Sequence, residues 1–297
     1  MADVLNILTV DVEEFFQVSN FENTISRTEW DSFASRVALP VQKLLQMFAD
    51  RKVKATFFVL GWLARRQPRL IREISRAGHQ IGSHSTWHKL IYDQSPQEFR
   101  SDLSESMKIL SDITGTAVAA YRAPSFSITE KSLWAFEILA EEGILYDSSV
   151  FPIFHDRYGL PRAPIAPFQI RTQAGPIWEV PASVVRISGV NFPVAGGGYF
   201  RLYPYWLTRA LCRRIHREGR PVVVYIHPWE LDPEQPRMRR LRWPARFRHY
   251  VNLAKTEHKL SRLLDHFNWG TLETALNHWL AHRPQPKMFT PCLTPVE

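Results

Sequence analysis

The feature that most constrains the fold is a regular alternation of two hydrophobic patterns over the first 150 residues. Short apolar runs typical of buried strands alternate with longer stretches of helical periodicity. The expected strands are Leu5–Val10, Ala55–Leu60, His79–Ser83, Ala117–Tyr121 and Ile144–Asp147. The expected helices are Val37–Asp50, Pro68–Ala77, Pro96–Ile113 and Lys131–Glu142. Strands that alternate with helices in this way predict a parallel sheet or a (β/α) barrel.

The alternation stops at about Phe151. Beyond it, the run WEVPASVV predicts a strand, and Phe192–Arg201, with glycines at 196–198, predicts a flexible loop that borders the pocket. Tyr203–Arg217 and Asn252–Phe267 show helical periodicity, and VVVYI at 222–226 has the pattern of a buried strand. The chain ends in a Pro-rich stretch, which we expect to be frayed. We find no internal repeat and no clear linker, so the sequence favours one elaborated domain.

The composition is that of a globular protein. Of the 297 residues, 45% are hydrophobic and 22% charged, which excludes disorder as a description of the whole chain. Cys212 and Cys292 belong to no CxxC pair, which argues against a disulfide framework or a cysteine zinc site. The N-terminus lacks the basic region of a signal peptide, and the apolar stretch Ala55–Ala64 is far shorter than the ~20 residues that cross a bilayer. We therefore expect a cytoplasmic protein.

Positive charge is concentrated in one part of the chain. The formal net charge is +8, yet Arg201–Arg262 alone holds 15 Lys and Arg against 5 Asp and Glu. A basic segment of this kind indicates an anionic partner without identifying it.

Four polar clusters follow predicted strands: TVDVEE (9–14), HSTWH (84–88), RAPSF (122–126) and YIHPWE (225–230). Catalytic groups gather at the carboxyl ends of strands in barrels and open α/β sheets. His84 and His88 have a spacing that can present two imidazoles to one metal. His278 and His282 share that spacing but have no acidic cluster beside them, so we interpret them as a solvated helix face.

The remaining clusters supply acids, a cation and a third histidine. Asp11 and Glu13 are two residues apart in an extended segment and so face the same side. One could complete a site of two histidines and one carboxylate, while the other stays free as a base. Arg122 could clamp a carboxylate, and His227, after the VVVYI strand, could be a general acid.

Together the clusters resemble the polysaccharide deacetylases, the NodB-homology group of carbohydrate esterases. His84–His88 matches the family's H-[ST]-x-x-H motif, Gly78-His79-Gln-Ile-Gly matches the run into it, and Arg122-Ala-Pro matches R-x-P. The family's first motif usually has two adjacent aspartates, whereas Val12 separates Asp11 and Glu13 here, as in a D-x-D/E branch. The stretches VNFPVAGGGYFRLYPYW and YIHPWELDPEQPR resemble the subgroup associated with exosortase and exopolysaccharide gene clusters.

The resemblance implies a distorted (β/α)7 barrel with a C-terminal elaboration. The catalytic domain would span residues 1–285, with a core at about 5–150 and 220–230, the elaboration at about 151–219 and 231–285, and a Pro-rich tail at 286–297. Glu13, His84 and His88 would hold a divalent metal ion, most often Zn²⁺ in such sites.

The resemblance also implies a reaction, the removal of an N-acetyl group from an amino sugar of a glycan. Asp11 would be the base, Arg122 would hold Asp11, and His227 would be the acid. Asp147 would orient His227, with Glu179 as a rival for that role, and a backbone N–H near Ser125 would help to stabilise the oxyanion.

Two alternatives stay open. One is a cyclic amide or imide hydrolase on the same fold, which a small closed pocket would favour. The other is a basic surface-binding protein without catalysis, motivated by Arg201–Arg262. We expect no nucleic-acid partner; the basic segment could instead meet an anionic membrane surface or lipid-linked intermediates at the inner membrane face.

Overall fold

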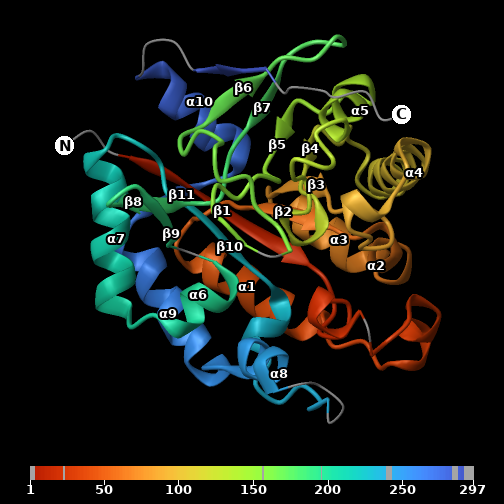
Figure 1. The fold of residues 1–297 in the computed structure, drawn as a ribbon. Coiled ribbons are helices and arrows are strands. Elements are labelled where there is room, and N and C mark those ends of the chain that lie inside the picture. Colours follow the sequence, from red (N-terminus) through yellow and green to blue (C-terminus); the bar gives the residue numbers. More distant parts are fainter. Residues whose placement is uncertain are drawn as a thin grey trace.

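A curled sheet of ten strands forms the centre of the protein, with helices packed around it (Figure 1). The computed structural model describes residues 4–22, 24–155, 157–194, 196–238, 243–282 and 287–290. Within these residues the strand order is β10-β1-β2-β3-β4-β5-β7-β6-β12, and β11 also pairs with β1. All of these ladders are parallel except the one between β6 and β7.

The strands are β1 (Leu5–Val12), β2 (Thr56–Val59), β3 (Gln80–Ser83), β4 (Ala120–Tyr121), β5 (Tyr146–Asp147), β6 (Phe168–Ile170), β7 (Ile177–Glu179), β8 (Val184–Ile187), β9 (Val190–Pro193), β10 (Val223–Ile226), β11 (Asn268–Gly270) and β12 (Met288–Phe289). The helices are α1 (Ala38–Asp50), α2 (Gly61–Arg66), α3 (Pro68–Arg76), α4 (Pro96–Thr114), α5 (Ala135–Glu141), α6 (Gly197–Leu202), α7 (Tyr205–Arg217), α8 (Trp243–Tyr250), α9 (Leu253–His266) and α10 (Leu272–Ala281).

The expected alternation of strands and helices in the first half is confirmed. The five predicted strands correspond to β1–β5 and the four predicted helices to α1, α3, α4 and α5. Helix α4 begins with the capping box read from the sequence, in which Ser95 and Glu98 each accept from the other's backbone N–H. The sheet is a curled half-barrel, because among the described residues no ladder joins its end strands β10 and β12.

Apolar side chains cover both faces of the central strands. Phe57 of β2 belongs to the same buried cluster as Leu44 and Phe48 of α1. Its neighbour Phe58 points to the other face and belongs to a cluster with Leu272 of α10. Burial on both faces explains why these strands appear in the sequence as continuous apolar runs.

The second half corrects three expectations. The run WEVPASVV is two strands, because β7 ends at Glu179 and β8, which pairs with β9 in a separate sheet, begins at Val184. The segment Phe192–Arg201 is no loop, since it contains the end of β9 and most of α6. Met288 and Phe289, inside the expected frayed tail, form β12 beside β6, while residues 291–297 lie outside the described part.

Gly196 and Gly197 allow the backbone to pass close to the ring of Tyr225. An added Cβ on Gly196 would lie 2.0 Å from the ring of Tyr225. Gly196 also forms an isolated parallel β-bridge with Tyr225 of β10. Gly197 has a φ of +47° and packs against the same ring. The glycines therefore let α6 begin directly against the sheet.

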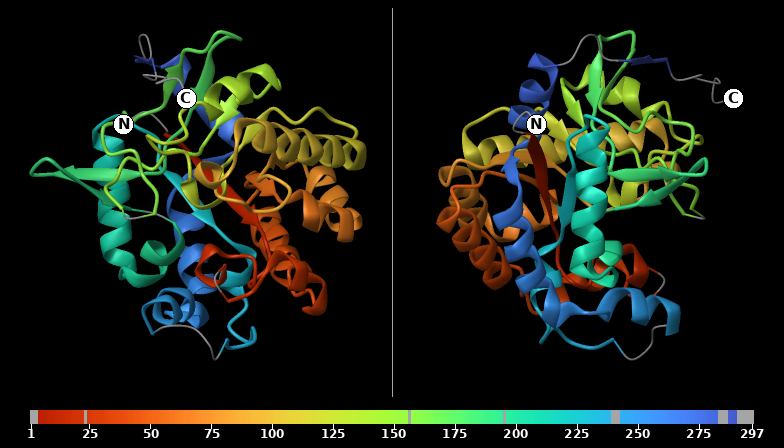
Figure 2. Two further views of the ribbon diagram at one scale, coloured as in Figure 1. Left: turned by 45° about the vertical axis from the view of Figure 1, so that its right-hand side comes forward. Right: turned by 90° about the vertical axis from the view of Figure 1, so that its left-hand side faces the viewer.

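Helices α2, α6 and α8 were not expected from the sequence, whereas α10 includes His278 of the expected solvated helix face. Helix α8 lies at the lower edge of the molecule in all three ribbon views (Figures 1 and 2). Among the described residues no helix combines the length and the apolar composition needed to cross a bilayer.

Candidate functional site

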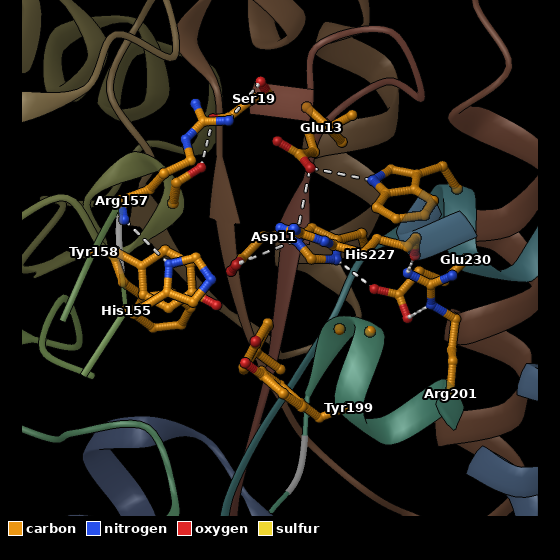
Figure 3. Close-up of a pocket in the computed structure, with 18 of the residues that line it drawn as sticks. Asp11, Glu13, Ser19, His155, Arg157, Tyr158, Tyr199, Arg201, His227 and Glu230 are labelled. Atoms are coloured by element: carbon orange, nitrogen blue, oxygen red, sulfur yellow. Dashed lines mark hydrogen bonds and ion pairs between the residues drawn. The ribbon is translucent and has the colours of Figure 1, made fainter. Parts of the chain in front are cut away.

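The four clusters meet in one cavity of about 390 Å³. Asp11 lies near the end of β1 and Glu13 just beyond it, His84 and His88 follow β3, and His227 follows β10. Parallel strands place their carboxyl ends at one edge of the sheet, which is why residues so distant in sequence come together. Figure 3 shows Asp11, Glu13 and His227 close together, with Tyr158 and Tyr199 on other sides of the cavity.

Glu13, His84 and His88 form a group suited to a metal ion. One ligand atom of each lies within 4.8 Å of the others, and all three side chains are buried. His84 Nδ1 is 2.7 Å from the carbonyl oxygen of Arg122, which leaves its Nε2 for a metal. His88 Nε2 lies 2.9 Å from Glu13 Oε2. Among the described residues, no other three His, Cys, Asp or Glu side chains are grouped in this way.

The protonation states of Glu13 and His84 also suit the binding of a metal ion. Burial alone would raise the pKa of Glu13, but the charges of His88 and His227 lower it to about 2. Burial lowers the pKa of His84 to about 4. An ionised carboxylate and a neutral imidazole are the forms that bind divalent metals, so the residues fit such an ion.

The segment that carries the two histidines is held from both sides. Ser85 and His88 adopt left-handed backbone conformations, with φ values of 67° and 50°. Asp102 of α4 accepts hydrogen bonds from the N–H groups of Thr86 and Trp87. Arg27 donates to the carbonyl oxygens of Trp87 and His88. These bonds let a strained loop, rather than a helix, bring both imidazoles to one point.

Arg122 holds Asp11, as the sequence predicted. Its Nη1 lies 2.8 Å from Asp11 Oδ1 and 2.6 Å from Thr9 Oγ1, and its Nε and Nη2 donate to the carbonyl and hydroxyl oxygens of Ser148. The Arg122 side chain is buried, so it fixes Asp11 without reaching solvent. Ser125 lines the cavity in a left-handed conformation with a φ of 53°.

His227 faces both acids. Its Nε2 lies 3.8 Å from Asp11 Oδ2 and 3.6 Å from Glu13 Oε1, and its Nδ1 lies 2.5 Å from Glu230 Oε1. Burial alone would lower the pKa of His227, but the carboxylates of Glu13, Glu230 and Asp11 outweigh it and raise the pKa to about 9. The ring is therefore a proton donor at neutral pH.

The prediction that Asp147 or Glu179 orients His227 is wrong, because Glu230 holds its Nδ1. Asp147 and Glu179 are register neighbours on β5 and β7 and are fully buried. Asp147 accepts from the Ser149 hydroxyl, and Glu179 accepts from the N–H of Val150. Burial and the charge of Asp147 raise the pKa of Glu179 well above its usual range, so the two carboxyl groups share a proton.

Three residues of the site were not assigned their roles from the sequence. Glu230, the last residue of the cluster YIHPWE, binds His227. Its position three residues after His227, across the 3-10 turn Pro228–Leu231, could have predicted this contact. Trp229 donates from Nε1 to Glu13 Oε1 at 3.1 Å and thus orients a candidate ligand. Arg201 Nε lies 3.3 Å from Glu230 Oε2, a contact between α6 and the turn after β10 that no local pattern reveals.

His278 and His282, which share the spacing of His84 and His88, have different surroundings. His278 lies on α10, His282 follows its end, and His282 Nδ1 contacts the carbonyl oxygen of His278. Neither belongs to the metal-suited group. Two histidines four residues apart therefore belong to a metal-suited group at a strand end, whereas the same spacing on a surface helix does not produce one.

Two family models match the chain. The polysaccharide deacetylase model matches residues 38–140, and a model described as a domain of unknown function, DUF3473, matches residues 148–277. Residues 38–140 are thus similar to the polysaccharide deacetylases, as the motifs indicated.

Similar proteins are named as glycan deacetylases. A peptidoglycan-N-acetylglucosamine deacetylase of Bacillus cereus is 34% identical over 96 residues, which are 32% of this chain and 35% of that protein. The peptidoglycan-N-acetylmuramic acid deacetylase PdaA of Bacillus subtilis is 30% identical over 120 residues, 40% of this chain and 44% of that one. The chain therefore matches less than half of the length of these relatives.

Solved structures support the fold. A candidate polysaccharide deacetylase from Mycobacterium smegmatis aligns with a TM-score of 0.66 at 19% identity, over 100% of this chain and 96% of that one. The Puue allantoinase aligns with a TM-score of 0.58 at 17% identity, over 94% and 92%. At these identities the likeness concerns the fold alone.

Proposed function

We propose that this protein is a metal-dependent hydrolase that removes N-acetyl groups from amino sugars of a polysaccharide or of its biosynthetic intermediate. The observation that carries the proposal is the constellation in one cavity: Asp11 fixed by Arg122, the Glu13, His84 and His88 group beside it, and His227 facing both acids. The matching family model and the names of the similar proteins support the substrate class.

Glu13, His84 and His88 would hold the metal ion, which we propose to be Zn²⁺. When bound, it would supply Lewis acidity toward the acetyl carbonyl and make water more acidic. Trp229 orients Glu13, and the Arg122 carbonyl orients His84, so the chain preorganises two of the three ligands.

The chain's own residues account for the proton transfers. Asp11 is the general base, since Arg122 occupies its Oδ1 and leaves Oδ2 toward the cavity to accept a proton from the attacking water. The N–H near Ser125 would donate to the oxyanion. His227 Nε2 would then protonate the amine nitrogen as its bond to the acetyl carbon breaks, while Glu230 keeps the proton on Nδ1.

A specific observation favours a second candidate, a cyclic amide or imide hydrolase. Walls surround the catalytic group on several sides, because His155, Arg157, Tyr158, α6 and the end of α8 also line the cavity. Acetate release from N-acetylglucosamine oligomers, measured beside ring opening of a cyclic imide, separates the two. Turnover of the oligomer supports deacetylation, and turnover of the imide alone would replace it with the second candidate.

A binding protein without catalysis would need none of the constellation, so the intact set argues against that alternative.

We further propose an exopolysaccharide context, from the likeness of the second half of the chain to the exosortase-associated subgroup, and a cytoplasmic location. The basic segment Arg201–Arg262 would meet an anionic membrane surface or lipid-linked intermediates.

A further inference from the structure

Within the basic segment, one stretch combines arginines with exposed aromatic rings. Residues 237–248 contain six arginines and no acidic residue. The structure describes 237–238 and 243–248 of this stretch, and Arg237, Arg246 and Arg248 are exposed. Such a density of one charge favours a polyanionic partner.

Helix α8 presents two aromatic side chains to solvent. Trp243 is 74% exposed and Phe247, four residues later on the same helix face, is 45% exposed. Their ring centroids are 5.5 Å apart and the rings are nearly parallel, at 15°. Leu202 of α6, which lines the cavity with Phe247, is 49% exposed. Exposed apolar side chains grouped beside a cavity mark an interaction surface.

The C-terminal end of α8 is anchored to the rest of the protein, so the fold holds this helix in place. His249 and Tyr250 are buried. Buried Arg201 donates to the carbonyl oxygens of Arg248, His249 and Val251 and also pairs with Glu230 of the active site. The exposed helix is therefore tied to the residue that holds His227, and Phe247 and Arg248 themselves line the cavity.

We propose that α8 docks this protein on an anionic lipid bilayer, with Trp243 and Phe247 in the interface and the arginines on the lipid phosphates. Amphipathic helices with Trp or Phe on one face and arginines beside them bind membranes in this manner. A soluble polyanion would need only the arginines. A nucleic acid would stack its bases on free ring faces, whereas Trp243 and Phe247 already stack on each other.

Docking at α8 would bring the mouth of the cavity to the headgroup region. A glycan still attached to a lipid could then enter without leaving the membrane surface. This last point rests on the proposed function, but the docking itself does not.

Co-sedimentation of the full chain with vesicles tests the proposal. Phosphatidylglycerol-containing vesicles should bind the protein, pure phosphatidylcholine vesicles should bind it much less, and added salt should weaken binding. Trp243→Ala should lower partitioning roughly tenfold or more, and Arg246→Gln about fivefold. Trp206→Ala is the matched control, because Trp206 is 69% exposed on α7 and should have no effect.

The outcomes separate docking from catalysis. Trp243 and Arg246 do not line the cavity, so both variants should release acetate from a soluble oligomer at the wild-type rate. Equal losses for Trp206→Ala and Trp243→Ala, or binding to a soluble polyanion such as heparin without binding to vesicles, would overturn the proposal. A wild-type protein that binds vesicles but releases no acetate would contradict only the proposed function.

Discussion

The buried pair of Asp147 and Glu179 makes the stability of this protein depend on pH in a defined direction. Burial and the neighbouring charge raise the pKa of Glu179 well above 4.5, so the folded protein keeps a proton there that the unfolded chain releases. The contribution of this pair to stability is then fully present below the unfolded pKa and is lost as pH rises through the folded pKa. The slope is at most about 1.4 kcal/mol per pH unit for one retained proton.

Glu179→Gln should remove most of this slope. The amide can still accept from the Val150 N–H and can donate to Asp147, so it replaces the shared proton with a hydrogen bond. Between about pH 6 and pH 8 the wild type should lose up to about 3 kcal/mol relative to the variant. Urea unfolding of both proteins over this range measures the difference. Parallel pH profiles would refute the shared proton and the raised pKa.

Three further outcomes follow from other contacts. Burial lowers the pKa of His79 to about 4, so stability present above pH 6.5 should be lost by up to about 3 kcal/mol as pH falls toward 4, and His79→Gln should reduce that loss in urea unfolding. Trp229→Phe removes the donor to Glu13 and should weaken metal affinity roughly 10- to 100-fold in a metal titration. Glu230→Gln removes a charge that favours protonated His227, so the alkaline limb of the kcat/KM profile for acetate release should move to lower pH; an unmoved limb would mean that His227 is not the acid.

The constellation could be predicted because it depends on strand ends. Asp11 lies near the end of β1, and His84, Arg122 and His227 follow three further strands, whose ends parallel pairing brings together. The assignment of Glu13 to the metal group needed the family resemblance as well, since spacing alone did not distinguish it from Asp11.

The errors have physical causes of two kinds. Asp147 also ends a strand, but its strand pairs with β7, where Glu179 is its register neighbour, so its carboxyl group interacts with that of Glu179 and not with His227. The glycines at 196–198 suggested flexibility because composition cannot show that the ring of Tyr225 occupies the space of a Cβ. A single sequence does not reveal which residues become register neighbours in a sheet or which side chains pack closely against each other.

The most direct test of the central claim is acetate release from an N-acetylglucosamine oligomer by wild type, Asp11→Asn and His84→Ala, each with its metal content measured. Asp11→Asn should keep its metal and lose roughly 10²- to 10⁴-fold in rate, because a base is removed and Glu13, His84 and His88 remain. His84→Ala should lose the metal and the activity together, while His282→Ala, the matched control, should lose neither. Loss of metal from Asp11→Asn would reverse the roles of Asp11 and Glu13, and no acetate from a metal-loaded wild type would contradict the account.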